Sequence, residues 1–232
     1  MKIALSGYGK MGKTIEKIAL DRGHEIVQKI TGDIAAIDFS EADIMIDFSL
    51  PNAAFKNIST AFSQNIPVVC GTTGWLENYE KAVERCKENN CGFIYASNFS
   101  VGVNLFFQLN EKLAGFMKGF SNYSVEIEEI HHTQKLDAPS GTAISLAQQI
   151  INNSDKTGWK LNEGSGNEIP IYAKRIPDVP GTHTVSYTSE VDVIEIKHTE
   201  KSREGFALGA VIAAEWLMRK QGVYTMKDVL SI

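Results

Sequence analysis

The first hundred residues alternate between short apolar runs and longer segments in which apolar residues recur at helical spacing. Continuous apolar runs bounded by turn residues are typical of buried strands, and a spacing of three to four residues is typical of a helix with one buried face. The predicted strands are 2–6, 24–30, 43–48, 66–70 and 92–96, and the predicted helices are 10–22, 52–65 and 76–90. Strands and helices in this order favour a parallel sheet covered on both faces, as in a doubly wound α/β fold.

From about residue 100 the pattern changes to strict alternation of apolar and polar residues. YSVEIEEI at 123–130 is the clearest case, and such alternation is typical of a strand with one face in water. Further elements are strands at 182–189 and 191–199, helices at about 103–118 and 140–152, a loop near 161–170, and a helical pattern in the last thirty residues. We therefore predict a second, α+β domain built on an open mixed, largely antiparallel sheet.

Composition and charge narrow the class of protein. The 232 residues are 43% hydrophobic and 22% charged, as expected of a soluble globular chain, and the net charge of -5 predicts neither nucleic-acid nor anionic-membrane binding. The cysteines at 70, 86 and 91 lack metal-type spacing, which favours reduced thiols. No apolar run approaches the ~18 residues of a membrane span. We expect a cytoplasmic protein.

A glycine-rich turn follows the first predicted strand. GYGKMG places Gly7, Gly9 and Gly12 in the spacing G-x-G-x-x-G at the start of the first helix. In this context the glycines allow a tight turn, close approach of backbone to a pyrophosphate, and packing of helix on strand. A Gly-rich turn without a ligand is the simpler alternative, but the βαβ order favours a Rossmann-like, dinucleotide-binding domain.

The choice between NAD and NADP stays open. The acidic residue that would bind the ribose hydroxyls of NAD is not evident, because Thr31 occupies the expected position and Asp33 lies slightly too far along. Lys10 and Lys29 are nearby cations that could meet a 2′-phosphate. The same two lysines would equally suit a solvated surface.

Two further loops fall at the carboxyl ends of predicted strands, where open α/β sheets bind ligands. They are DFSLP at 47–51 and GTTGW at 71–75. Gly71, Thr72 and Thr73 offer small side chains, hydroxyls and backbone N–H groups, which suit the nicotinamide half of a cofactor. An ordinary helix-capping turn explains them equally well.

The segment EEIHHTQKLDAPSGTAIS, 128–145, combines turn residues with ionisable ones. His131, His132 and Lys135 follow a predicted strand, and Gly141 and Thr142 open the next helix. Backbone N–H groups at that helix start could receive a carboxylate, the lysine would add positive charge, and a histidine could transfer a proton near neutral pH. We predict an anion-binding and proton-transfer site for a small dicarboxylate.

A metal site is the less favoured alternative for the same histidines. His183 or His198 could add a nitrogen ligand to the pair, but neither a helical His-x-x-x-His spacing nor a cysteine cluster accompanies them. We also find no carboxylate at a ligand spacing. No metal is therefore expected.

The motifs GYGKMG, GTTG, ASNFSVGVN (96–104) and EIHHTQKLDAPSGTA (129–143), in that order, closely resemble those of 4-hydroxy-tetrahydrodipicolinate reductase, long called dihydrodipicolinate reductase. The resemblance continues through PGTHTVSY (180–187), SREGFALGA (202–210) and a C-terminal MKDVL. Two features depart from longer family members: Ser6 stands where many have glycine, and the segment between the second and third strands is short.

The resemblance implies a reductase of the diaminopimelate and lysine pathway that uses NADH or NADPH. It implies a dinucleotide-binding domain at 1–102 plus 204–232, and a substrate-binding and oligomerisation domain at 103–203 that forms a homotetramer. The implied catalytic residues are His131 and Lys135, and the implied substrate contacts are His132, Gly141 and Thr142. The implied cofactor contacts, which include the glycine loop, are Gly7, Gly9, Lys10, Met11, Gly12, Gly71, Thr72, Thr73, Asn98 and Phe99.

A protein of another class could keep the same first domain. A non-catalytic sensor would bind the dinucleotide without reducing anything, but binding alone does not require a proton donor such as Lys135. An aldehyde dehydrogenase-type or dehydratase enzyme would need a reactive cysteine, and we interpret Cys70 as part of the sheet core. The sequence therefore favours the reductase.

Overall fold

The computed structural model describes residues 1–32, 34, 37–202 and 204–232. The chain forms two compact units. Unit 1 comprises Met1–Val101 and Glu204–Ile232, and unit 2 comprises Gly102–Arg203. Among the described residues, none of the helices combines the length and the apolar character that crossing a membrane would need.

Unit 1 is built on one six-stranded sheet in which every neighbouring pair is parallel. Its strands, in the order in which they lie in the sheet, are β11 (Gly222–Tyr224), β5 (Gly92–Tyr95), β4 (Val68–Cys70), β3 (Ile44–Asp47), β1 (Lys2–Ser6) and β2 (Glu25–Ile30). The central strands β3 and β4 are buried throughout, as their unbroken apolar runs predict. Strand β11 was not predicted, because its three residues are too few to show a period.

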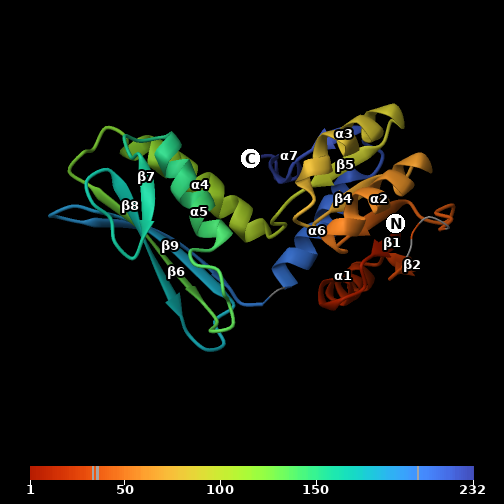
Figure 1. The fold of residues 1–232 in the computed structure, drawn as a ribbon, viewed down its shortest axis with the longest axis horizontal. Coiled ribbons are helices and arrows are strands. Elements are labelled where there is room, and N and C mark those ends of the chain that lie inside the picture. The colour runs from red at the N-terminus through yellow and green to blue at the C-terminus, as the bar shows by residue number, and fades with distance from the viewer. Residues whose placement is uncertain (33, 35–36, 203) are drawn as a thin grey trace. The chain divides into compact units, whose positions relative to one another are not determined.

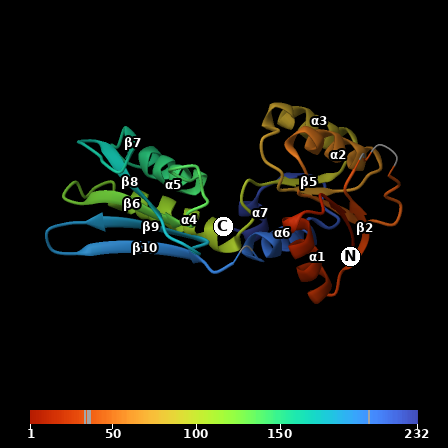
Figure 2. The same ribbon diagram turned by 60° about the horizontal axis from the view of Figure 1, so that its bottom comes forward.

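Helices cover both faces of this sheet (Figure 2). One face packs on α1 (Lys10–Asp21), α6 (Glu204–Leu217) and α7 (Met226–Leu230), and the other on α2 (Pro51–Ser63) and α3 (Tyr79–Glu88), which a short 3-10 turn at Leu76–Asn78 precedes. Each face has its own apolar core, centred on Ile15 and Val211 on one side and on Phe62 and Phe93 on the other. The predicted Rossmann-like fold is confirmed.

Unit 2 is built on a five-stranded sheet that is mixed (Figure 1). In sheet order the strands are β10 (Val193–Glu200), β9 (Gly181–Thr188), β6 (Ser124–His131), β8 (Glu168–Arg175) and β7 (Gly158–Leu161). The pairs β10–β9 and β9–β6 are antiparallel, whereas β6–β8 and β8–β7 are parallel. The second, mixed sheet is confirmed, but only half of its pairings are antiparallel.

The parallel half was missed because its two strands carry weak local signals. Strand β7 has four residues, and β8 begins at Glu168 inside the predicted loop 161–170. Pro170 has no N–H to give to a sheet and reads as a strand breaker. The prediction of a loop was therefore wrong from Glu168 onward.

Two helices, α4 (Val101–Met117) and α5 (Gly141–Asn152), pack on one face of the unit 2 sheet and close its core. Along β6 the inward residues Val125 and Ile127 are buried, while Ser124 and Glu126 face out. The alternation of β6 continues through Glu129 and His131, so both of these ionisable side chains also point inward. The candidate site grows from this end of the strand.

Candidate functional site

The glycine loop connects β1 to α1 in unit 1, and its three glycines differ in the space that is available for a side chain. Gly7 has φ +87°, and a Cβ there would lie 2.1 Å from the carbonyl oxygen of Phe48. A Cβ on Gly12 would lie 2.2 Å from the carbonyl oxygen of Gly7. A Cβ on Gly9 would meet nothing within 4 Å. The fold itself therefore requires Gly7 and Gly12, whereas the space beside Gly9 is open.

The start of α1 suits an anionic ligand. Gly9 is the N-cap residue, it supplies no side-chain cap, and the first turn of the helix holds no acidic residue. The first N–H groups of a helix have no acceptor within the helix, and the helix dipole adds positive potential there. Lys10 is exposed at the same end. These residues fit the pyrophosphate of a dinucleotide.

A cavity of about 300 Å³ in unit 1 brings together five of the residues predicted to bind the cofactor. It is lined by Met11, Gly71, Thr72, Thr73 and Phe99, with Phe48, Ser49, Ala96, Ser97 and Phe206 completing the wall. The Phe99 ring is tilted against Phe48, with 5.9 Å between ring centroids. Asn98 lies outside this lining, and its Oδ1 accepts a hydrogen bond from the Ser100 N–H at 2.9 Å.

The hydroxyl of Thr72 is already engaged by the protein. It donates to Asp47 Oδ2 at 2.6 Å and accepts from the Ser49 N–H at 2.8 Å. Asn57 Nδ2 lies at 2.9 Å from Ser6 Oγ and at 3.0 Å from Asp47 Oδ1, so one buried network joins β1, β3, α2 and the loop after β4. Ser6 thus points inward rather than into the glycine loop. The Thr72 side chain therefore fixes the GTTGW loop, whereas Thr73 is exposed.

The carboxyl end of β2, where a Rossmann fold recognises the ribose, carries an ion pair. Lys29 Nζ lies 2.6 Å from Glu16 Oε1 and 4.8 Å from the ring centroid of Tyr8, whose hydroxyl also bonds Glu16. Lys29 is therefore not simply a solvated cation. Thr31 is exposed, and Asp33 lies outside the described residues.

The dicarboxylate site predicted from sequence falls within unit 2. Ser140 is the N-cap of α5, and its Oγ accepts from the Ala143 N–H at 3.2 Å. Gly141 opens the helix, and a Cβ there would meet nothing within 4 Å. The helix start is thus accessible, and the N–H groups of Gly141 and Thr142 have no acceptor within the helix.

Lys135 lies in the loop between β6 and α5 and is held by a neighbour. Its Nζ contacts Asp137 Oδ1 and Oδ2 at 2.8 and 2.7 Å. This ammonium lowers the pKa of Asp137, which is the more exposed partner. Asp137 therefore fixes the position of the Lys135 ammonium group.

Arg175, which the sequence analysis did not single out, ties this loop to β8. Its guanidinium donates to the carbonyl oxygens of Lys135 at 3.3 Å and Asp137 at 2.6 Å, and to Glu129 Oε1 at 3.1 Å. The next residue, Ile176, donates its N–H to the His131 carbonyl oxygen at 2.8 Å. These bonds hold the end of β6 at His131, and the following loop that carries Lys135, against β8.

Another cavity, of about 310 Å³, lies in unit 2 and is lined in part by His132. Its other lining residues are Thr133, Gln134, Pro177, Asp178, Val179, Pro180 and Ser202. Pockets that bind small molecules begin at about this volume. His132 therefore faces a space of suitable size, next to the loop that holds Lys135.

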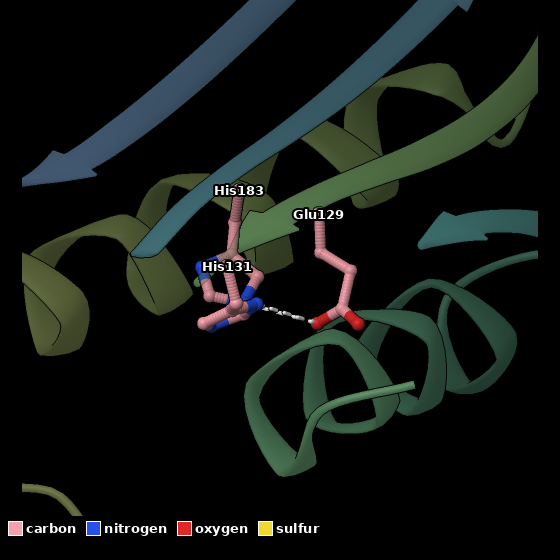
Figure 3. Close-up of side chains that lie close together, drawn as sticks. All are labelled: Glu129, His131 and His183. Atoms are coloured by element: carbon pink, nitrogen blue, oxygen red, sulfur yellow. Dashed lines mark ion pairs between the residues drawn. The ribbon is translucent and has the colours of Figure 1, made fainter. Parts of the chain in front are cut away.

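The side chains of Glu129, His131 and His183 lie close together (Figure 3). One ligand atom from each falls within 4.8 Å of the others, so the expectation of no carboxylate at a ligand spacing was wrong for Glu129. Both oxygens of Glu129 are already engaged, one by Arg175 at 3.1 Å and one by the Ser140 N–H at 3.0 Å. Arg175 also adds positive charge, so we interpret this Glu129 cluster as a proton-sharing network.

Within the Glu129 cluster, the pKa values of both Glu129 and His131 are lowered. Burial lowers the pKa of His131 to about 4, although the charge of Glu129 opposes that shift. Burial alone would raise the pKa of Glu129, but interactions with His183, Ser140 and Arg175 bring it to about 2. At neutral pH the cluster therefore holds an anionic carboxylate beside a neutral imidazole.

We expect this arrangement to make the protein sensitive to mild acid. The unfolded chain binds a proton at His131 near pH 6.5, and the folded chain does so near pH 4, so folding stability falls as the pH drops through that window. The full effect of one such group is about 3 kcal/mol. Urea unfolding at a series of pH values checks this, and a His131→Asn variant should lose stability less steeply between pH 6.5 and 4. Equal slopes for both proteins would contradict it.

Profiles of two protein domains match consecutive parts of the chain. The N-terminal domain of dihydrodipicolinate reductase matches residues 1–99, and its C-terminal domain matches residues 102–230. The chain belongs to the dihydrodipicolinate reductase family. It is accordingly an NAD(P)H-dependent oxidoreductase of lysine and diaminopimelate biosynthesis.

Relatives along the whole chain agree with the family profiles. The 4-hydroxy-tetrahydrodipicolinate reductase of Christiangramia forsetii is 63% identical, over 100% of this chain and 98% of its own length. That of Archaeoglobus fulgidus is 36% identical, over 99% and 100%. Both carry the name of an enzyme, and nothing in these comparisons favours the non-catalytic sensor.

A solved structure shares the fold. It is the dipicolinate-bound dihydrodipicolinate reductase of Paenisporosarcina sp. TG-14, which superposes with a TM-score of 0.82 over 97% of both chains at 23% identity. The solved structure thus shares the fold described above for units 1 and 2.

Proposed function

We propose that the loop at the end of β6 and the start of α5 form the substrate side of the reaction that converts 4-hydroxy-tetrahydrodipicolinate to tetrahydrodipicolinate. The observation that carries the proposal is that His131, His132 and Lys135 fall in one short segment between β6 and the open start of α5, and that Arg175 of β8 bonds this segment. A dicarboxylate needs donors and positive charge, and the loop offers both. The dipicolinate bound to the Paenisporosarcina relative is a ligand of this kind.

In this proposal each residue has a separate task. The nicotinamide, when bound, supplies a hydride. Loss of the 4-hydroxyl group as water leaves a carbon conjugated with the imine, and hydride addition to that carbon leaves negative charge that must be stabilised or protonated. His131 is neutral near pH 7, so Lys135 is the cation that donates a proton to the substrate, while His131 takes up a proton from water at its ring nitrogen and passes it to the Lys135 amine. His132 and the N–H groups of Gly141 and Thr142 bind the carboxylates.

Unit 1 is the proposed cofactor domain, in which Gly7, Gly9, Lys10, Met11 and Gly12 hold the pyrophosphate. The 300 Å³ cavity lined by Gly71, Thr72, Thr73 and Phe99 receives the nicotinamide half, and Asn98, which lies outside this lining, is the remaining proposed contact. The test of the activity is loss of NADH or NADPH absorbance with substrate generated in the assay. Absence of turnover with either cofactor would overturn the proposal.

NADH is the proposed preferred cofactor. A 2′-phosphate near the end of β2 would need a cation, and Glu16 already neutralises Lys29 at 2.6 Å. The same carboxylate would repel a phosphate placed beside it. Parallel titrations with NADH and NADPH measure the preference directly.

We expect Glu16→Gln to shift that preference toward NADPH. The substitution removes a negative charge and releases Lys29, so kcat/KM with NADPH relative to NADH should rise, by up to about fivefold for a charge near the surface. Glu25→Gln is the matched control, because Glu25 is an exposed carboxylate at the opposite end of β2. A ratio that moves equally in both variants would assign the effect to net charge alone.

A homotetramer in the cytoplasm completes the proposal. Apolar side chains at Val191, Val193 and Ile194 are exposed at the edge of the unit 2 sheet, where further copies of the chain could cover them. The three cysteines are buried and unpaired, as expected of a reducing compartment. Light scattering coupled to gel filtration should give four chain masses.

A further inference from the structure

Glu129 is a carboxylate in a position that the strand pattern reserves for a core residue. It follows Val125 and Ile127 on the inward face of β6, and its exposed fraction is 0%. Burial of an ionised carboxylate is destabilising by several kcal/mol unless charges and hydrogen bonds compensate it. A residue in this position needs partners that offset that penalty.

Two of the partners of the carboxylate are the imidazole rings of His131 and His183. Arg175 and the Ser140 N–H bond the two oxygens, as described above, and Oε2 also lies 3.4 Å from His131 Nδ1 and 3.7 Å from His183 Nε2. His183 is opposite Glu129 in the register of β6 and β9, and its Nε2 lies 3.0 Å from Ser140 Oγ. The register of the sheet therefore places His183 beside the carboxylate, and His131, two residues further along β6, lies on the same face as Glu129.

An ionised carboxylate can only accept hydrogen bonds, so it selects the tautomer of the ring beside it. With Nδ1 of His131 facing Glu129, the proton of the neutral ring belongs on Nδ1, and Nε2 is left to accept or donate one. The 3.4 Å separation is long for a hydrogen bond, as catalytic contacts often are before substrate binds. It would shorten once the ring became positive.

We propose that Glu129 is a positioning residue that keeps the proton of His131 on Nδ1 and stabilises the imidazolium formed when Nε2 takes up a proton. The proposal deepens the proposed function, on which its assignment of His131 rests. Glu129 itself need not touch the substrate, because it acts through the ring.

The charges around His131 show why this carboxylate matters. His183 from β9, Lys135 from the loop and Arg175 from β8 all disfavour a positive ring. Glu129 from β6 is the group that favours it among the influences on His131 in the described residues. Without the charge of Glu129, the charged groups around His131 that remain would all disfavour the imidazolium.

The test compares Glu129→Gln with Glu128→Gln. Glu128 is the preceding residue of β6, lies on the outward face and pairs with Lys174 at the surface, so its variant has the same charge change on the same strand. We expect Glu129→Gln to lower kcat by at least about 10-fold, which is part of the roughly 10² to 10⁴ that a positioned acid or base contributes. The KM for NADH should stay within about twofold, and Glu128→Gln should match the wild type.

The tautomer gives a readout that a merely structural role would not move. Long-range ¹H–¹⁵N spectra of the ligand-free protein, with the His131 signal assigned by its loss in His131→Asn, should show the proton on Nδ1. In Glu129→Gln the Nε2–H form should gain population, and in Glu128→Gln it should not. A wild-type proton on Nε2 would overturn the proposal, even if Glu129→Gln failed to fold.

Failure of this proposal can be told from failure of the proposed function. Full activity in His131→Asn would remove His131 from the reaction and the role of Glu129 with it. Loss of activity in His131→Asn together with wild-type kcat in a folded Glu129→Gln would overturn the positioning role alone. Circular dichroism establishes which variants are folded.

Discussion

Replacement of Lys135 by alanine is expected to lower kcat by about 10²-fold or more while leaving the affinity for NADH near that of the wild type. A positioned proton donor contributes about 10² to 10⁴ in rate, and His131, whose pKa is held near 4, cannot supply the missing positive charge at neutral pH. The predicted cofactor residues all belong to unit 1, whereas Lys135 belongs to unit 2. Steady-state kinetics and a fluorescence titration with NADH measure the two effects separately.

The fold should tolerate this substitution. Asp137, the partner that Lys135 leaves behind, is 60% exposed at its side chain, so water can solvate its carboxylate. Lys174→Ala is the matched control, because Lys174 is a surface lysine of unit 2 paired with Glu128. If Lys135→Ala abolished NADH binding, the substrate site would have been assigned to the wrong unit. Wild-type kcat would exclude Lys135 as the proton donor.

The glycine loop and the HHTQK segment could be predicted because their signals are local. Gly7, Gly9 and Gly12 lie within six residues, and the unit 1 elements around them show continuous apolar runs or helical periodicity. The helix start at Gly141 likewise follows a local cap signal, Ser140. Sites made from neighbouring residues need little knowledge of the rest of the fold.

Glu129 was missed although a signal was present. In YSVEIEEI the period of two that places Val125 and Ile127 inward also places Glu129 inward, and a buried carboxylate indicates a partner. No local signal identifies those partners. Arg175 and His183 reach Glu129 only through the pairing of β8 and β9 with β6, which brings together residues 46 and 54 positions apart.

Strand β8, like the partners of Glu129, could not be predicted from local sequence. Pro170 breaks the local strand pattern, and its neighbours carry too little alternation to outweigh it. The strand forms because it fills the space between β6 and β7, with Ile169 and Ile171 fully buried. The parallel half of the sheet, which delivers Arg175 to the site, therefore depends on tertiary packing.

Alanine at Gly9 is expected to weaken NADH binding without changing the stability of the protein. The backbone of Gly9, with φ -80° and ψ -155°, is open to an L-residue, and a Cβ there meets no atom of the described residues within 4 Å. The methyl group would instead occupy the space into which a pyrophosphate must come. We expect the Kd for NADH to rise at least about tenfold, a loss of about 1.4 kcal/mol, with an unchanged melting temperature.

Gly12→Ala is the comparison that separates loss of ligand from loss of fold. Its Cβ would lie 2.2 Å from the Gly7 carbonyl oxygen, so α1 and the loop must move apart. Overpacking of this kind typically destabilises by about 1–3 kcal/mol, and the melting temperature should fall together with NADH affinity. Equal stability losses in both variants would mean that the space beside Gly9 is needed by the protein itself. Wild-type NADH affinity in Gly9→Ala would mean that the pyrophosphate does not approach the loop there.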